Sequence, residues 1–413
     1  MAQIFMLGKR ELCYGNQIGT DFSIPKTITL IDIEEHLYKI HDSEPYVKVY
    51  LGNAKLEMRM VLETSFSKIL IPSLECSNCI ATDNVYVSES SLTLDKSDSL
   101  QNLTYKNYQL KAYFLKETFY IGTYEIFKLP LYLVMSSNEP LKFTYDGILG
   151  LGIDSDNIIS NLKLHRKIIS GYFSISLSSS YLSDFESTLT FANISSINQI
   201  NTTYVPFSIP KNSSKWEIFI SNISMNDNSF EYANIVELDI KNPNIEIPYN
   251  ILSKLIALVK DIDSSCIMKN GQLKCILEEK QFRNIPDLVF HSGNDSFYIR
   301  PMHYVQYFED DKCYTFMLTG TNNDKIIMGR PFFRDHVVAF YQDEMKVEVY
   351  RNSFYPDPDE SKTNLMILYV LAGFIAIIIL GIFIYYRKRN HELEQNSHHG
   401  YYIFKAEDSE YHR

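Results

Sequence analysis

A weak internal repeat is the feature of this 413-residue chain that most restricts its fold. In each copy an apolar run ends in a carboxylate, at Glu63 and at Asp239, and a proline follows nine residues later. Each copy then contains two apolar residues and a glycine, at Gly150 and at Gly329. The carboxylate and the glycine are 87 residues apart in the first copy and 90 in the second. This order predicts two similar lobes, each with one carboxylate on a loop, and a site on the pseudo-two-fold axis between them.

The sequence between residues 46 and 350 favours strands over helices. Runs rich in Ile, Val, Tyr and Phe alternate with clusters of Asn, Asp, Ser and Gly. The best helical pattern covers residues 249–262. We therefore predict a mainly β protein, with an N-terminal β lobe over residues 46–170 and a C-terminal β lobe over residues 171–350. Residues 1–45 are either the remnant of a pro-segment or the first strands of the sheet.

Residues 365–386 form an uncharged, apolar stretch of 22 residues. A helix of this length spans a bilayer core of about 30 Å. A buried core helix is the alternative, but soluble helices rarely run this long without a polar face. Basic residues 387–389 follow the stretch, so the positive-inside rule places the tail, residues 387–413, in the cytoplasm. The large N-terminal part is then lumenal or extracellular, joined to a single-pass helix by a linker over residues 351–364.

The first 30 residues contain no apolar run long enough for a signal peptide. Either the natural chain starts upstream of Met1, or the apolar stretch is itself the insertion signal and leaves the large part cytosolic; we expect the first. Glycosylation sequons give weak support to a lumenal position of the large N-terminal part, because all six precede the apolar stretch. These sequons are at Asn102, Asn193, Asn201, Asn212, Asn222 and Asn294.

Composition excludes some classes of partner. The net charge of −11 and the lack of a basic stripe argue against nucleic-acid binding. The six cysteines allow 15 disulfide connectivities. The pair Cys76 and Cys79 could be a redox or zinc motif, but no second CxxC and no nearby pair of histidines accompanies it. We therefore expect no metal and no cofactor.

Several segments resemble the pepsin-like aspartic proteases. The sequence YDGILGLG, residues 145–152, nearly repeats that family's signature and is the most specific match. Residues 46–73 are similar to the first strands and the catalytic loop, with Gly52 placed 11 residues before Glu63. The resemblance covers residues 46–350 and implies a bilobal fold with a cleft that takes a peptide or protein. The apolar stretch is similar to the anchor of the membrane-bound members.

The resemblance also implies two disulfides. Cys275 and Cys313 lie where the family has the disulfide of its C-terminal lobe, and Cys76 and Cys79 lie near its small N-terminal loop disulfide. Cys13 and Cys266 remain, and they could pair with each other.

In this family, two Asp carboxylates share one proton across the lobe boundary, each in an Asp-Thr-Gly turn. The first turn here reads Glu63-Thr64-Ser65-Phe66. The resemblance assigns Glu63 to a catalytic position and Thr64 to bracing of the two loops. The extra methylene of Glu63 moves its carboxylate by roughly 1.5 Å, and such a misplacement costs on the order of 100-fold in rate. Ser65 stands where the family has glycine, and Phe66 replaces a hydroxyl.

The second turn reads Asp239-Ile240-Lys241. Asp239 keeps the second catalytic position, but Ile240 lacks the hydroxyl of the bracing threonine. The ammonium group of Lys241 could pair with a carboxylate, lower its pKa and discourage the shared proton.

A hairpin closes over the substrate in this family and carries a tyrosine beside glycines. The corresponding stretch here places Tyr105 at the flap and substrate-binding position. Lys106 and Tyr108 replace the hinge glycines. We expect this flap to open less easily.

These observations predict a membrane-anchored pepsin-like protein with little or no peptidase activity, whose cleft binds an extended peptide or a partner protein. One alternative is an active aspartic-type endopeptidase that uses a Glu63–Asp239 dyad. Another is a purely structural surface protein with a filled cleft, which packing of Phe66 and Lys241 into the dyad space would support.

Overall fold

The computed structural model describes the part of the chain that forms three β-sheets and one further helix. Residues up to Asn352 form one compact unit, and residues from Ser353 onward belong to a second. The described residues are 26–30, 44–80, 86–88, 91–177, 187–191, 204–210, 213–269, 271–308, 312–351 and 369–389. Cys13, the sequons at Asn193, Asn201 and Asn212, most of the predicted linker and the predicted tail beyond residue 389 lie outside them.

A seven-stranded sheet has the strand order β2-β3-β8-β4-β7-β6-β5. Along β2 the inward side chains Val47, Val49 and Leu51 are fully buried, as the two-residue period of a strand requires. The strands are β2 (Tyr46–Leu51), β3 (Leu56–Glu63), β4 (Leu70–Ile80), β5 (Asp95–Tyr105), β6 (Tyr108–Ile121), β7 (Tyr124–Lys142) and β8 (Gly147–Gly150). The short helix α1 (Ile158–Leu164) follows them.

A ten-stranded sheet lies in the other part of the first unit, with β19 pairing beside β20. Its strands are β12 (Glu217–Met225), β13 (Asn228–Leu238), β14 (Ile245–Pro248), β15 (Ile267–Lys269), β16 (Gln272–Cys275), β17 (Leu288–Ser292), β18 (Asp295–Ile299), β19 (Val305–Phe308), β20 (Cys313–Thr321) and β21 (Ile326–Met328). Its helices are α2 (Tyr249–Ile262), α3 (Glu279–Phe282), α4 (Pro301–Tyr304) and α5 (Arg330–Asp335). The prediction of a helix over residues 249–262 is confirmed, because α2 has these bounds.

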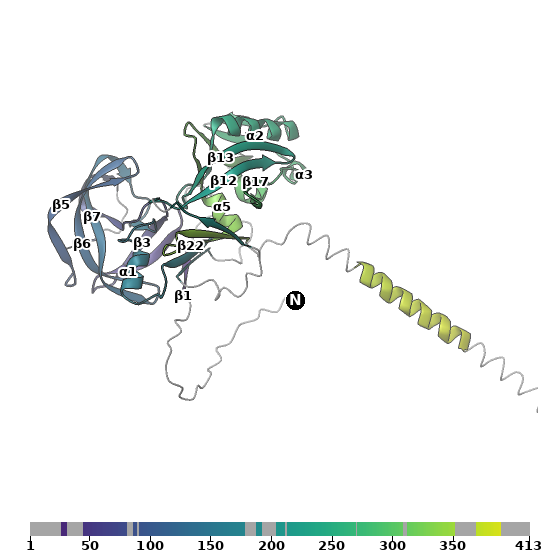
Figure 1. Cartoon of the computed structure of the whole chain (residues 1–413), viewed down its shortest axis with the longest axis horizontal. Coiled ribbons are helices and arrows are strands. Elements are labelled where there is room, and N and C mark those ends of the chain that lie inside the picture. The colour runs from purple at the N-terminus through teal and green to yellow at the C-terminus, as the bar shows by residue number, and fades with distance from the viewer. Residues whose placement is uncertain are drawn as a thin grey trace, which may run out of the picture. The chain divides into compact units, whose positions relative to one another are not determined.

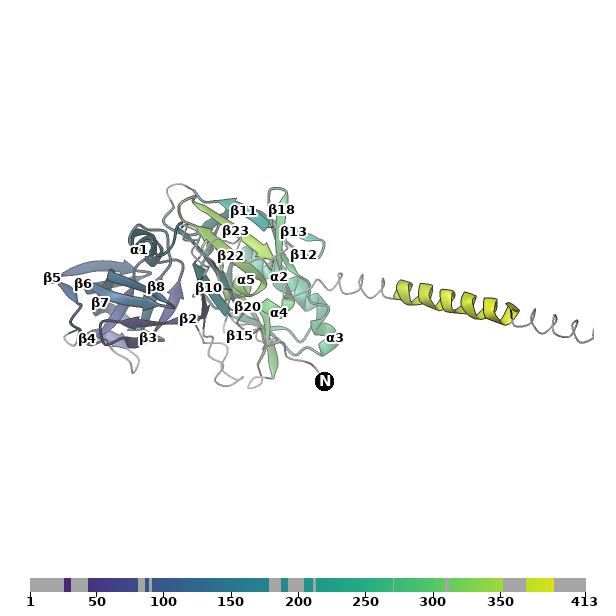
Figure 2. The ribbon, with the colours of Figure 1, turned by 90° about the horizontal axis from the view of Figure 1, so that it is seen from below.

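A third sheet of six strands has the order β1-β10-β9-β22-β23-β11. Its strands are β1 (Lys26–Leu30), β9 (Tyr172–Ser176), β10 (Ser187–Phe191), β11 (Tyr204–Ser208), β22 (His336–Tyr341) and β23 (Lys346–Arg351). In Figure 1 and Figure 2, β22 lies between β3 of the seven-stranded sheet and β12 of the ten-stranded sheet. Strand β1 pairs antiparallel with β10, so residues 26–30 form a strand of this sheet. One of the two alternatives for residues 1–45 was that they contain the first strands.

The repeat seen in the sequence is a repeat of strand pairing. Strand β3 runs parallel to β8, with Glu63 opposite Gly150, and β13 runs parallel to β21. Both glycines are required by close approach. A Cβ on Gly150 would lie 2.4 Å from the backbone of Ser67, and one on Gly329 would lie 2.0 Å from the carbonyl oxygen of Asn244. Each carboxylate loop therefore packs its own backbone against a glycine.

Trp216 connects the seven-stranded sheet and the ten-stranded sheet. Its side chain is fully buried, and its indole Nε1 donates a hydrogen bond of 2.8 Å to the carbonyl oxygen of Leu151. Its ring packs edge-on against Phe173 and Phe340 of the six-stranded sheet. The hydrophobic core is thus shared by all three sheets, which holds the ends of β3 and β13 in fixed relation. The mainly β, bilobal fold predicted from the sequence is confirmed.

The disulfides confirm one predicted pair and correct another. Cys76 is bonded to Cys79, as predicted. The predicted Cys275–Cys313 bridge is wrong, because Cys275 is bonded to Cys266 and Cys313 is a buried free thiol. The suggested pairing of Cys266 with Cys13 is therefore wrong as well.

Strand register explains this correction. Strands β15 and β16 pair Ile267 with Lys274, which brings the flanking Cys266 and Cys275 face to face. Strands β16 and β20 pair Cys275 with Tyr314, so the neighbouring Cys313 points to the opposite face of the sheet.

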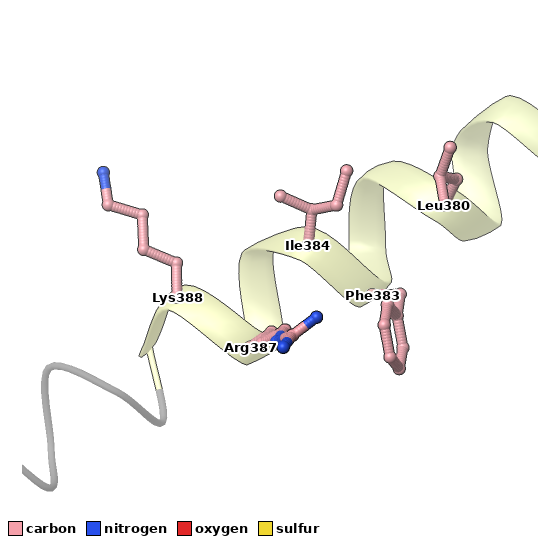
Figure 3. Close-up of a pocket in the computed structure, with 5 residues that line it drawn as sticks. All are labelled: Leu380, Phe383, Ile384, Arg387 and Lys388. Atoms are coloured by element: carbon pink, nitrogen blue, oxygen red, sulfur yellow. The ribbon is translucent and has the colours of Figure 1, made fainter.

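One described helix, Tyr369–Arg389, is long and apolar enough to cross a membrane by length and composition. It overlaps the predicted span, residues 365–386, and contains the basic residues that follow that span. Figure 3 shows that one shallow hollow is lined by side chains of this helix alone, namely Leu380, Phe383, Ile384, Arg387 and Lys388. The hollow is therefore the flank of a single helix and not a cavity between elements.

The disulfide assignment predicts a specific pattern of thiol reactivity. Peptide mapping should find the links Cys76–Cys79 and Cys266–Cys275, with Cys313 alkylated only after denaturation. Replacing Cys275 by Ser should lower the free energy of unfolding by about 2–3 kcal/mol, because the bridge closes a short loop. The matched Cys313→Ser variant should keep both links. A Cys275–Cys313 peptide in the native protein would contradict the assignment.

Candidate functional site

The fold brings together the two carboxylates of the repeat. Glu63 is the last residue of β3, and Asp239 follows directly after β13. Glu63 is fully buried, and Asp239 is only 6% exposed. The backbone holds each carboxylate strand against its glycine strand. The N–H of Leu151 donates to the carbonyl oxygen of Glu63 at 2.8 Å, and the N–H of Asp239 donates to that of Met328 at 3.0 Å.

Thr64 braces the two carboxylate loops across the lobe boundary. Its hydroxyl donates to the carbonyl oxygen of Leu238 at 2.7 Å and accepts from the backbone N–H of Ile240 at 3.0 Å. Ile240 is fully buried in the core and takes part in the brace through its backbone. The loss of a hydroxyl at Ile240 therefore does not disconnect the loops, because the single Thr64 hydroxyl makes both bonds.

The two residues that replace glycine fit their sites without backbone strain, since neither Ser65 nor Lys241 has a positive φ. The hydroxyl of Ser65 donates to Oε1 of Glu63. The backbone N–H of Lys241 donates to Oδ1 of Asp239 at 3.0 Å. Each substitution thus retains or adds a hydrogen bond to the neighbouring carboxylate.

The turn of the β5–β6 hairpin reaches the carboxylates. Tyr105 lies opposite Tyr108 at the end of the hairpin, and its side chain is only 1% exposed. Its hydroxyl donates to Oε2 of Glu63 at 3.0 Å. The flap position predicted for Tyr105 therefore places this side chain against the dyad itself.

Lys106 lies in the turn of the same hairpin, with φ of 51°. Its ammonium nitrogen is 3.2 Å from Oε2 of Glu63 and 3.2 Å from Oδ2 of Asp239. One cation thus contacts both members of the dyad. The sequence predicted only a stiffer flap from Lys106. The available signal was a positive charge directly after the tyrosine predicted at the flap position.

Lys241 and two aromatic rings surround Tyr105. The Lys241 ammonium donates to the Tyr105 hydroxyl at 2.9 Å and lies 3.8 Å from Glu44. From its sequence position, Lys241 could have paired with a carboxylate of the dyad. Its ammonium instead contacts Tyr105 and Glu44. Phe66 packs edge-on against Tyr105 at 5.0 Å between ring centroids, and Tyr108 stacks on it at 6.3 Å.

The surroundings separate the pKa values of the two carboxyl groups. Burial raises the pKa of Asp239 to about 7, and the negative charge of Glu63 adds to this shift while Lys106 opposes it. Burial also acts to raise the pKa of Glu63, but the charges of Lys106 and Lys241 and the Ser65 hydrogen bond outweigh it, so the pKa is lowered. Between the two pKa values the pair therefore carries one proton, which lies mainly on Asp239, while Glu63 is ionised.

No set of three or more His, Cys, Asp or Glu side chains that could hold a metal ion occurs among the described residues. Cys76 and Cys79 are disulfide-bonded and are not a zinc pair. The chemistry that this arrangement supports is proton transfer by two carboxyl groups, one ionised and one protonated.

The brace predicts that one hydroxyl supports both loops. Thr64→Val, which keeps the shape but removes the hydroxyl, should lower the free energy of unfolding by about 1–3 kcal/mol, because a buried N–H and a buried carbonyl lose their partner. Thr64→Ser keeps the hydroxyl and should lose less. Urea unfolding of the two variants beside the wild type measures this. Equal midpoints for all three proteins would show that the hydroxyl braces nothing.

Comparison with known proteins agrees with this geometry. The family model for eukaryotic aspartyl proteases matches residues 45–351. Pepsin A of Sus scrofa is 24% identical over 343 residues, which are 78% of this chain and 85% of that protein. Vacuolar protease A of Aspergillus fumigatus is 24% identical over 276 residues, covering 64% of this chain and 67% of that protein. Plasmepsin IV of Plasmodium falciparum is 23% identical over 311 residues, covering 71% and 66%.

The matched region contains both carboxylate loops, the bracing Thr64, the β5–β6 hairpin and all three sheets except β1. It covers most of the chain, and the two carboxylates meet where the internal repeat predicted a site. The chain belongs to the eukaryotic aspartyl protease family.

Proposed function

We propose that this protein is a membrane-anchored, pepsin-like protein with little or no peptidase activity in its closed form. The observation that carries the proposal is the position of Lys106, whose ammonium lies 3.2 Å from both dyad carboxylates. A water molecule activated by the dyad must lie within hydrogen-bond distance of both carboxyl groups. The ammonium group occupies such a position, so water and a substrate carbonyl are excluded while the hairpin is closed.

Charge supports the same conclusion. The negative charges of Glu63 and Asp239 hold the pKa of Lys106 above its usual value against the opposing effect of burial. The ammonium therefore stays protonated across the pH range in which proteins are folded. A permanent cation between the carboxylates stabilises the ionised Glu63 and makes it a weaker base.

We propose that the protein binds an extended peptide or protein segment by strand addition. Strand β5 is the last strand in the order of the seven-stranded sheet and is mostly exposed. Within the described residues it pairs with β6 alone, so its outer edge presents backbone donors and acceptors. Such an edge accepts an added strand without any access to the dyad.

Two other functions each have one observation in their favour. The separated pKa values of Glu63 and Asp239 favour an active endopeptidase, because acid–base catalysis needs one ionised and one protonated group. The contacts of Phe66 and Lys241 with Tyr105 favour a structural surface protein with a filled cleft. We place both below the closed, inactive form, because Lys106 contacts both carboxylates directly.

Membrane anchoring is supported by the apolar helix Tyr369–Arg389. We propose that it spans the bilayer once, with the β unit lumenal or extracellular and the tail cytoplasmic. The three basic residues at the end of the helix support this orientation.

Peptide cleavage tests the proposed inactivity. The purified full-length protein in detergent should cleave a diverse peptide library across pH 3 to 7 no faster than the Asp239→Ala variant. Mass spectrometry of new peptide termini measures this, with circular dichroism as the control for folding. Cleavage by the wild type that is absent from Asp239→Ala would show a working dyad and favour the endopeptidase.

Extraction and glycan mapping test the anchor and its orientation. Alkaline carbonate should leave the full-length protein in the membrane pellet and release a variant that ends at residue 360. Asn294, exposed in the β17–β18 turn, should carry a glycan that endoglycosidase removes, and Asn294→Gln should lose that mass shift. A β unit without glycan and open to cytosolic protease would contradict the orientation.

A further inference from the structure

We infer that the dyad is latent: Glu63 and Asp239 form a competent peptidase pair that Lys106, from the protein's own hairpin, holds inactive. Opening of the β5–β6 hairpin then controls the activity. This inference rests on the proposed inactivity of the closed form and gives its cause, since the fault lies with the inserted ammonium and not with the carboxylates.

The carboxylates keep their positions through contacts that do not involve Lys106. Glu63 accepts hydrogen bonds from Ser65 and Tyr105, and Asp239 accepts one from the backbone of Lys241. The hydroxyl of Thr64 ties the two loops together. Removing the Lys106 side chain therefore leaves both carboxyl groups oriented and opens the space between them.

Few contacts hold the Lys106 side chain in the site. It lies in a hairpin turn, its side chain is 39% exposed, and within the described residues that side chain forms two ion pairs, both with the dyad. Its positive φ of 51° suits glycine and asparagine better than lysine. Replacement by either residue should relieve backbone strain and remove the cation at the same time.

With Lys106 gone, the position of its ammonium, within hydrogen-bond distance of both carboxyl groups, is open to a water molecule, and hydrolysis balances. Glu63 takes a proton from this water, the water oxygen bonds to the peptide carbonyl carbon, and Asp239 gives its proton to the carbonyl oxygen. The resulting diol returns a hydroxyl proton to Asp239 as the carbonyl reforms and the carbon–nitrogen bond breaks. The proton held by Glu63 passes to the leaving amine.

Acid alone does not free this site. The carboxylate that would have to be neutralised is Glu63, and the groups that face it are Lys106 and Tyr105 from the hairpin, Ser65 from its own loop and Asp239 and Lys241 from the other lobe. Glu44 faces the far side of Lys241. Burial acts to raise the pKa of Glu63, but the cations Lys106 and Lys241 lower it. The Glu63–Lys106 ion pair therefore persists when Asp239 gains its proton.

The test compares full-length variants in detergent on the peptide library. Lys106→Gly and Lys106→Asn should cleave about tenfold faster than the wild type or more, because the ammonium no longer occupies the position of the catalytic water and the hairpin, without its two ion pairs, opens more often. Lys106→Arg keeps a cation and should stay inactive. The matched control is Lys55→Gly, which changes another lysine of positive φ, in the β2–β3 turn away from the dyad, and should not differ from the wild type.

Double variants and hydrogen exchange complete the test. Lys106→Gly combined with Asp239→Ala, or with Glu63→Gln, should abolish the gained cleavage. Amide exchange over residues 103–110 should be faster in Lys106→Gly, which reports an open hairpin independently of activity. A folded Lys106→Gly protein with an open hairpin and no cleavage above the double variants would overturn latency and leave the proposed inactivity standing. Asp239-dependent cleavage by the wild type at the rate of Lys106→Gly would instead overturn the proposed inactivity.

Discussion

The close approach of each carboxylate loop to a glycine is the constraint on which the rest of this structure depends. Strand β3, which ends at Glu63, runs parallel to β8, which ends at Gly150. Strand β13, directly before Asp239, runs parallel to β21, directly before Gly329. A Cβ on either glycine would overlap the backbone of the adjacent loop. The backbone hydrogen bonds between these strands place Glu63 and Asp239 at corresponding ends of two sheets. The Thr64 hydroxyl then needs to span only one short gap to join the loops.

Two buried carboxyl groups that both contact one ammonium group lie too close together to be ionised at the same time without a compensating charge. Two features of the site reduce the repulsion between the carboxyl groups. Asp239 holds a proton below neutral pH, and Lys106 brings a cation between the pair. A buried charge is tolerated when it is paired and hydrogen-bonded. Removing one partner leaves the other charge buried and uncompensated, which destabilises the folded protein. The closed hairpin is thus part of the charge balance of the site and not a separate lid.

The substitutions that depart from the family motif are mutually consistent. Ser65 donates to Glu63, Lys241 and Phe66 pack on Tyr105, and Tyr105 donates to Glu63. Ser65, Phe66 and Lys241 thus each contact another altered residue or the hairpin. A network of this kind stabilises the closed position of the hairpin over the dyad.

Local sequence patterns were sufficient for those features that depend on neighbouring residues along the chain. Strand-like runs and the spacing of Glu63, Asp239, Gly150 and Gly329 were enough to predict two β lobes with a shared site, and the helical pattern of residues 249–262 was enough to predict α2. Tertiary structure alone decided which cation meets the carboxylates and which cysteine pairs with Cys275. Lys106, not Lys241, reaches the dyad because a left-handed turn at the tip of a long hairpin points it there. Cys266, not Cys313, meets Cys275 because strand register puts them on the same face, and register depends on pairing across the sheet that no local pattern contains.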